Sequence, residues 1–119
     1  MKYEWIDEYC MAKKGTEKEY KEEWKALRYM IGGKMYVLMG NDNAGNAIMT
    51  VKLEPPYGED LRHQYSDIVP GYYMNKQHWN SLDLNGSVPD DVVKNMLDQS
   101  YNLVRTSLSQ KLQKQIGLD

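Results

Sequence analysis

The chain of 119 residues has one cysteine, no phenylalanine and no long apolar run. A single cysteine, Cys10, excludes an internal disulfide and is typical of a reducing compartment. A membrane-spanning helix needs about 18 or more consecutive apolar residues, and no window approaches that length. The N-terminus, MKYEWIDEYC, carries acids and lacks the apolar run of a signal peptide. We therefore expect a single domain over residues 1–119, located in the cytoplasm and without a membrane partner.

The sequence also has no large excess of basic over acidic residues, or of acidic over basic ones. The chain has 15 Lys and Arg against 17 Asp and Glu, a formal net charge of −2. Neither sign is concentrated in one third of the sequence. A strongly basic domain would point to nucleic acid, and these totals give no such signal. Only the last stretch, with Arg105, Lys111 and Lys114, is locally basic.

Motifs of catalysis are absent as well. No HExxH, CxxC, P-loop or dinucleotide-binding pattern occurs. Two histidines, His63 and His78, and one cysteine stand in unrelated segments, which gives no reason to expect a metal. Cys10 falls on the apolar side of a predicted helix, where an inert buried thiol is expected. We predict no catalytic residue, no cofactor and no metal.

What the sequence does contain is an alternation of helical and strand patterns. A helix is predicted over about residues 3–14, ending at Gly15. Two strands, 27–31 and 34–39, flank Gly32-Gly33, and a two-residue Gly-Gly loop is a strong hairpin signal. Further strands are predicted at 47–53 and 79–84, separated by Pro55-Pro56 and a short helix. A long final helix follows Ser87-x-x-Asp90, which has the form of a capping box. Its apolar residues are predicted to form one stripe: Val93, Leu97, Tyr101, Val104 and Leu108.

This order predicts an α+β fold. We expect an antiparallel sheet of about four to five strands, flanked by an N-terminal helix, a short middle helix and a long C-terminal helix. Both faces of residues 35–39 are apolar, which indicates an interior strand. The ten tyrosines can fill core positions where their hydroxyls reach a partner, so some of these rings should lie at the core boundary.

Three stretches in order, GGKMYVL, PGYYMNKQHWN and LDLNGSVPDD, carry a family resemblance. From about Tyr9 to Leu112 the chain resembles the MmcQ/YjbR family, whose members look like GGKMF-AL, PGYHMNK-HWN and LDGS-PD. The resemblance implies a small domain of the secretion-chaperone-like class. It also implies a DNA-binding role through wing-like hairpins and loops, without an established enzymatic activity or cofactor.

The chain departs from the family pattern at three places. Residues 21–24, Lys-Glu-Glu-Trp, stand where many members have a Pro-Phe-Gly turn. Tyr73 stands where His is common, which removes a possible companion of His78, and Ser109 stands where Pro often follows the last helix.

The crowded stretch PGYYMNKQHWN supplies the candidate site residues. For nucleic acid, Lys76 offers a phosphate contact, His78 a hydrogen bond or stack, and Tyr73 an aromatic face. Asn75 is predicted to form a turn, and Trp79 to begin the last strand as a core ring that fixes the loop. Lys34, at the exit of the Gly-Gly hairpin, is the sixth candidate. The alternative is structural: a solvated Lys76, and a His78 bonded to a backbone carbonyl.

The sequence therefore predicts weak, salt-sensitive DNA binding by a monomer through Lys34, Tyr73, Asn75, Lys76, His78 and Trp79. A second hypothesis is a chaperone-like module that binds a protein partner through an exposed Met- and Tyr-rich surface. A third is a small-molecule-binding protein or enzyme that uses His78 in a deep pocket. A basic groove would favour the first, and a contiguous Met and Tyr patch the second.

Overall fold

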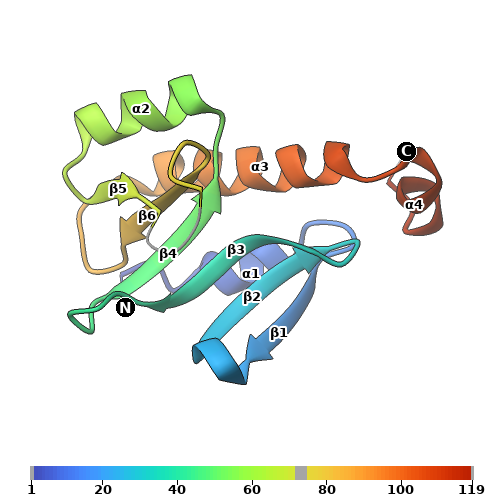
Figure 1. The fold of residues 1–119 in the computed structure, drawn as a ribbon, viewed down its shortest axis with the longest axis horizontal. Helices are drawn as coiled ribbons and strands as arrows, with labels where there is room; N and C mark the ends of the chain where they lie inside the picture. Colours follow the sequence, from blue (N-terminus) through green and yellow to red (C-terminus); the bar gives the residue numbers. More distant parts are fainter. Residues whose placement is uncertain (1, 72–74, 119) are drawn as a thin grey trace.

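The computed structural model describes residues 2–71 and 75–118 and has an α+β architecture (Figure 1). Its helices are α1 (Ile6–Met11), the 3-10 turn η1 (Glu22–Trp24), α2 (Pro55–Gln64), α3 (Asp90–Ser107) and α4 (Gln110–Gln115). Its strands are β1 (Glu17–Lys21), β2 (Ala26–Ile31), β3 (Lys34–Asn41), β4 (Ala47–Lys52), β5 (Ile68–Pro70) and β6 (Trp79–Asp83).

The six strands form one antiparallel sheet in the order β1-β2-β3-β4-β6-β5. The predicted interior position of β3 is confirmed, and the predicted strand number was slightly too low. The two edge strands were not predicted from the sequence. In β1, EKEYK, four of five residues are exposed, and β5 has only three residues. An edge strand held by backbone hydrogen bonds on one side needs no apolar alternation, so the periodicity signal fails there.

The Gly32-Gly33 hairpin between β2 and β3 is confirmed. Both glycines have positive φ, 57° and 80°, as a primed turn requires. Further along, the register shifts between Tyr29 and Met30, which leaves Tyr36 as an extra residue in β3. Because of this bulge, Tyr36 and Val37 are both fully buried although they are consecutive in the strand.

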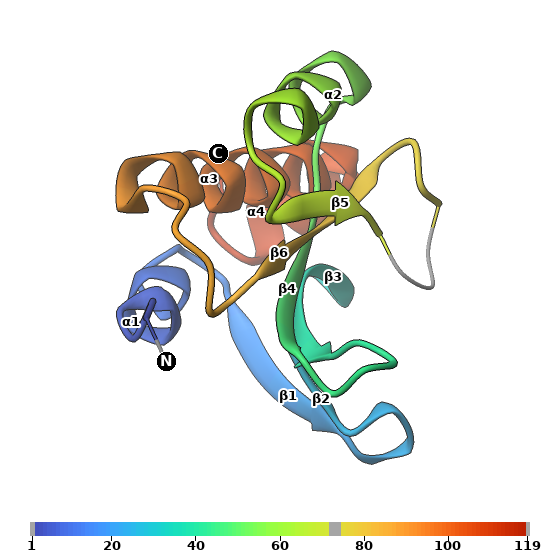
Figure 2. The ribbon, with the colours of Figure 1, turned by 90° about the vertical axis from the view of Figure 1, so that its left-hand side faces the viewer.

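Helices α1 and α3 lie on the same face of the sheet, and the core fills the space between (Figure 2). The Tyr29 hydroxyl donates to Asp7 in α1 at 2.8 Å. The Ser100 hydroxyl in α3 donates to the carbonyl of Tyr36 at 2.6 Å. The predicted apolar stripe of the long helix is confirmed, since Val93, Leu97, Tyr101, Val104 and Leu108 are all buried.

The helix ends differ from the predictions. The first helix is shorter than expected. The capping box was wrong: Pro89 is the N-cap residue of α3 without a side-chain cap, and the Ser87 amide donates to Asp67. The long helix ends at Ser107, and a separate helix follows. Ser109 is its N-cap, with its hydroxyl accepting from the Leu112 amide at 3.1 Å.

Candidate nucleic-acid interface

The loop of residues 75–78 is built around a turn, as predicted. The Asn75 side chain accepts from the Gln77 amide at 2.9 Å, and the Asn75 carbonyl accepts from the Trp79 amide at 2.9 Å. The Asn75 side chain thus closes the turn by a local hydrogen bond, a common use of Asn. Lys76 is exposed and His78 is half-buried. Tyr73 lies outside the described residues.

The far end of this loop is fixed by close backbone contacts. The carbonyl of His78 accepts from the Leu53 amide at 2.7 Å, and the Gly71 amide donates to the Trp79 carbonyl at 2.7 Å. A Cβ on Gly71 would come within 2.8 Å of the Trp79 Cβ, so only glycine fits at this position. Trp79 begins β6 as predicted, but its ring is half-buried and is not part of the core.

A buried amide next to Trp79 ties the loop to α2. Asn80 is fully buried, its side-chain N–H donates to the His78 carbonyl at 3.3 Å, and its oxygen accepts from Arg62. Buried polar groups are costly unless they are paired, so this arrangement holds both segments in place. Arg62 therefore has a structural role in this arrangement.

The predicted site residues do not form one group. Lys34 begins β3 at the Gly-Gly hairpin, and its ammonium is 3.5 Å from the Ser107 hydroxyl of α3. Trp79 instead pairs in the sheet with Lys52 at the end of β4, beside Ser100. Ser100 and Ser107 are about 10 Å apart along the helix axis. The structure therefore separates Lys34 from Lys76, His78 and Trp79.

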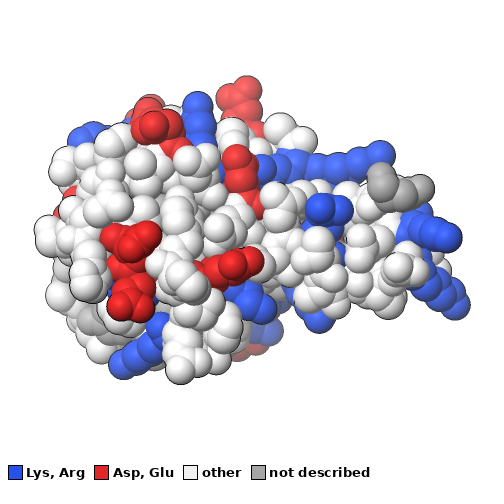
Figure 3. All heavy atoms as spheres, turned by 90° about the horizontal axis from the view of Figure 1, so that it is seen from above, with Lys and Arg blue, Asp and Glu red and all other residues white. Residues whose placement is uncertain are grey.

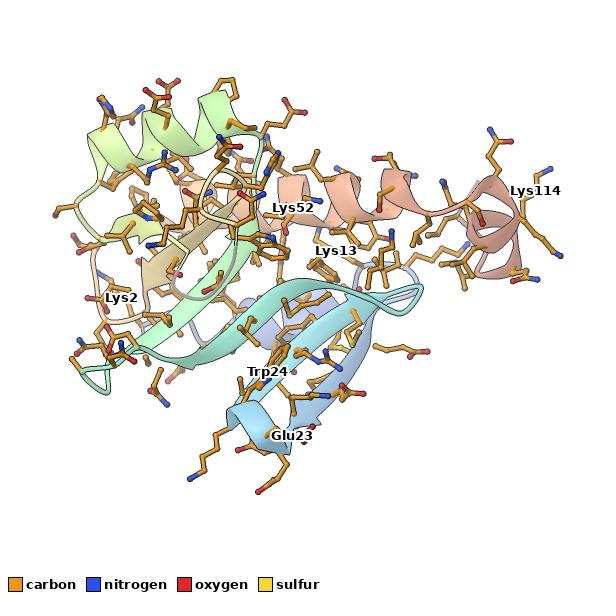
Figure 4. All side chains as sticks on the ribbon, in the orientation of Figure 1. Lys2, Lys13, Glu23, Trp24, Lys52 and Lys114 are labelled. Atoms are coloured by element: carbon orange, nitrogen blue, oxygen red, sulfur yellow. The ribbon has the colours of Figure 1, made fainter. Side chains whose placement is uncertain are left out.

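Lys34 belongs to a second group of cations, which we call the basic end: Lys14, Lys34, Arg105, Lys111 and Lys114. Helix α4 brings them together by docking on the Gly-Gly hairpin. A Cβ on Gly32 would lie 2.7 Å from Leu108 and 3.2 Å from Leu112. The Lys14 side chain lies against Gly117, where a Cβ would be 3.1 Å from its Cε. Figure 4 shows Lys114 at the far end of the molecule from Lys2.

The cations of the basic end form no ion pair with an acid among the described residues. The ion pairs among the described residues involve four other cations: Lys13, Lys18, Lys21 and Arg28. Residues 99–118 contain no Asp or Glu, and their exposed side chains are amides, hydroxyls and cations with Gly117. Seen from above, the described residues at the end formed by α4 show Lys and Arg but no Asp or Glu, whereas the visible acids lie over the other half (Figure 3).

The structure gives no arrangement for catalysis in its described part. Cys10 is fully buried, and this burial raises the pKa of its thiol to about 12, so it stays protonated and inert. No group of three or more His, Cys, Asp or Glu in residues 2–71 and 75–118 is placed to hold a metal ion. His78 lines neither the hollow beside α2 and α3 nor the one beside β5 and β6. None of the helices described is long and apolar enough to cross a membrane.

Comparison with known proteins gives the family. The YjbR family model matches residues 11–103. This chain belongs to the YjbR family. It is 33% identical over 94 residues to the uncharacterized protein YjbR of Escherichia coli K12, covering 79% of each chain. It is 30% identical over 113 residues to the uncharacterized protein YyaQ of Bacillus subtilis, covering 84% of this chain and 95% of YyaQ.

Solved structures share the fold. The crystal structure of Deinococcus radiodurans protein DR2400, of family-model domain DUF419, superposes with a TM-score of 0.84 at 27% identity. The match covers 96% of this chain and 86% of that one. A Pseudomonas syringae protein at 22% identity has a TM-score of 0.75, over 87% of this chain and 99% of its own. The predicted family and fold class are thus confirmed. The family-model match contains Lys14 and Lys34, whereas Arg105 and α4 follow it.

Sequence reasoning missed the basic end as a unit. Arg105, Lys111 and Lys114 were visible as a locally basic stretch, and Lys34 as a hairpin lysine. Lys14 looked like an ordinary residue near the end of a helix. The contact that brings these cations together is made by Leu108 and Leu112, which pack over Gly32 and place α4 beside the hairpin. No pattern in the sequence predicts that contact.

Proposed function

We propose that this YjbR-family protein binds nucleic acid and that the phosphate backbone contacts the basic end. The observation that supports the proposal is the group of five cations at one end of the molecule, without ion pairs to described acids. Around them, Thr106 and Gln113 offer hydroxyl and amide groups of the kind that commonly bind phosphate and sugar oxygens. The cytoplasmic location that we infer from the single buried cysteine would give such a surface access to nucleic acid.

The loop at residues 75–78 is a weaker candidate for the primary contact. It offers Lys76 as an exposed cation, with Lys52 near Trp79. Non-specific affinity rises with the number of phosphates neutralised, so five clustered cations contribute more than one or two. We retain Lys76, His78 and Tyr73 as a predicted secondary contact, and Lys34 as part of the primary one.

The chaperone-like hypothesis requires a contiguous Met and Tyr surface. The large exposed apolar side chains of the described residues are Met11, Tyr20, Trp24 and Val69, and they come from four different elements. Lys21 and Arg28 also lie over the Trp24 ring, at 5.7 and 5.4 Å from its centroid. No observation on these residues favours a protein-binding role over the basic end.

A salt series with fluorescent oligonucleotides tests the proposal. The variant Lys111→Gln/Lys114→Gln removes two charges from α4. The control Lys2→Gln/Lys25→Gln removes two charges elsewhere, from exposed lysines that also lack ion pairs in the described structure. We expect the basic-end variant to weaken binding and to reduce the log–log salt slope by about 1.4 for a single strand and about 1.8 for a duplex.

The control should bind as the native chain does, because Lys2 and Lys25 lie away from the basic end. Equal losses in the two variants would show that binding depends on net charge and not on this surface. A native chain that binds no oligonucleotide at low salt would overturn the proposal outright. Thermal unfolding of both variants verifies that the fold is retained.

A further inference from the structure

A hollow of about 560 Å³ lies between the start of α2 and the outward face of α3. This size falls within the range of small-molecule and base-sized sites. Its walls carry polar side chains from both helices: Glu54, Tyr57, Asn95, Gln99, Asn102 and Thr106. Leu103 adds an apolar surface. We call this hollow the amide groove, because three carboxamides line one side of it.

The carboxamides form a regular stripe on α3. Asn95, Gln99 and Asn102 are spaced i, i+4 and i+7, so they lie on one face of the helix. The Gln99 oxygen accepts from the Glu54 amide at 2.8 Å, which leaves the Gln99 NH₂ available. Asn95 and Asn102 are exposed and have no side-chain hydrogen bond to another described residue. The stripe therefore presents donors and acceptors at fixed positions.

The groove does not suit an anion. No cation lines it, and it contains the carboxylate of Glu54. Asp98 also lines it, but this carboxylate is already paired with Lys13 and accepts from Tyr9. The N-terminus of a helix attracts anions through its amide N–H groups, and Pro55 and Pro56 remove two of them from α2. A neutral group with both donor and acceptor edges fits this lining better.

One end of the groove lies next to residues of the basic end. Asn102 and Thr106 line it, and Arg105 lies between them in the sequence within the same helical turn. Lys34 reaches the next residue, Ser107. The neutral amide stripe of α3 and a cationic surface are thus about one helical turn apart, near 5.4 Å along α3. A nucleotide combines the same two features, since it joins a neutral base to an anionic phosphate.

We propose that the amide groove binds unpaired bases of a single-stranded nucleic acid whose phosphates contact the basic end. This inference rests on the proposed function and adds the class of nucleic acid. Unpaired bases expose the hydrogen-bonding edges that amide side chains recognise, and they stack on aromatic rings such as Tyr57. The bases of a duplex are stacked inside it and do not enter a recess between two helices.

The test uses three fluorescent 12-mers: a single strand, its duplex, and an abasic single strand that keeps the phosphates without the bases. The native chain should bind the intact single strand more tightly than the other two. In Asn95→Ala/Asn102→Ala, the intact strand should lose about three- to tenfold in affinity, as expected for one or two lost hydrogen bonds. Binding of the abasic strand and the salt slope should not change, because no cation is removed.

Gln64→Ala is the matched control, since Gln64 is an exposed amide at the other end of α2 and does not line the groove. It should bind all three probes as the native chain does. Equal affinity of the native chain for intact and abasic strands would overturn the groove proposal. If Lys111→Gln/Lys114→Gln still weakened oligonucleotide binding in that case, the proposal for the basic end would remain supported. If the native chain binds none of the probes at low salt, both proposals fall together.

Discussion

Three tyrosines occupy the centre of the core, and each keeps its hydroxyl hydrogen-bonded. Tyr3 donates to the Val88 carbonyl at 2.8 Å, Tyr29 donates to Asp7, and the Tyr36 hydroxyl lies 2.7 Å from that of Thr16. All three rings are at most 1% exposed. Burial is the main cause that raises the pKa of each phenol, so all three stay neutral at physiological pH. A core without phenylalanine is possible because these hydroxyls have partners inside the fold.

Gly32 and Gly33 provide a matched pair of substitutions in the hairpin. Both have positive φ, so alanine at either position costs roughly 1–2 kcal/mol in backbone strain. A Cβ on Gly32 would also lie 2.7 Å from Leu108, whereas nothing lies within 4 Å of one on Gly33. We expect Gly32→Ala to lower the free energy of unfolding by about 1 kcal/mol or more beyond Gly33→Ala. Urea unfolding measures the difference, and equal effects would argue against the docking of α4 on this turn.

At the scale of elements, Ser100 joins α3 to the two central strands. Its hydroxyl accepts from the Lys52 amide at 2.9 Å and donates to the Tyr36 carbonyl at 2.6 Å. Ser100→Ala leaves a buried N–H without this acceptor. We expect the free energy of unfolding to fall by about 1–3 kcal/mol. Chemical denaturation gives the value, with the exposed Ser107→Ala as a control that should change it less.

Helix α1 is attached to the sheet by Asp7, and this attachment should depend on pH. Hydrogen bonds from Lys18 first, and then from Tyr29, hold the pKa of Asp7 below its usual value. A lowered folded-state pKa stabilises the fold above the unfolded-state pKa of about 4, and this stabilisation is lost as pH falls through the folded-state value.

Asp7→Asn should therefore lower the free energy of unfolding at pH 7. Because the side chain is half-exposed and screened, we expect about 0.5–1 kcal/mol. The difference from the native chain should stay constant above about pH 5 and close below about pH 4. Unfolding curves from pH 2 to pH 7 show this directly, and a difference that grew in acid would contradict the assignment.

At the scale of the whole molecule, charges are separated although the total is near zero. The principal extents are 40 × 32 × 25 Å, and the Debye length at physiological ionic strength is about 8 Å. Acids over the α2 half are therefore largely screened from a ligand at the basic end. For this reason the formal net charge of −2 is a poor guide to phosphate binding here.

Two charge reversals with the same net charge test this separation. Lys76→Glu and Lys114→Glu each lower the net charge by two, one in the 75–78 loop and one in α4. We expect Lys114→Glu to weaken oligonucleotide binding severalfold more than Lys76→Glu at low salt, because like charges repel phosphate most at the contact surface. Fluorescence anisotropy at 50 mM salt distinguishes them. A larger effect of Lys76→Glu would make the loop the primary contact, as the sequence first indicated.

Much of the fold could be predicted because its signals are local. The Gly-Gly turn, the apolar faces of β3 and the stripe from Val93 to Leu108 depend only on neighbouring residues and their periods. The bulge at Tyr36, the edge strand β1 and the separate helix after Ser109 could not be found in this way. Each depends on a partner segment that lies elsewhere in the chain.

The features of the candidate site also divide into those set by local sequence and those set by contacts between distant segments. The sequence by itself determined the family, the fold class, the turn at Asn75 and the acid-free composition of residues 99–118. Only the tertiary structure decided that Lys34 lies apart from Lys76 and His78 and close to Lys14 and α4. The physical reason is that Leu108, just before α4, and Leu112 within it pack against the hairpin at Gly32, and this non-local contact sets which cations are neighbours.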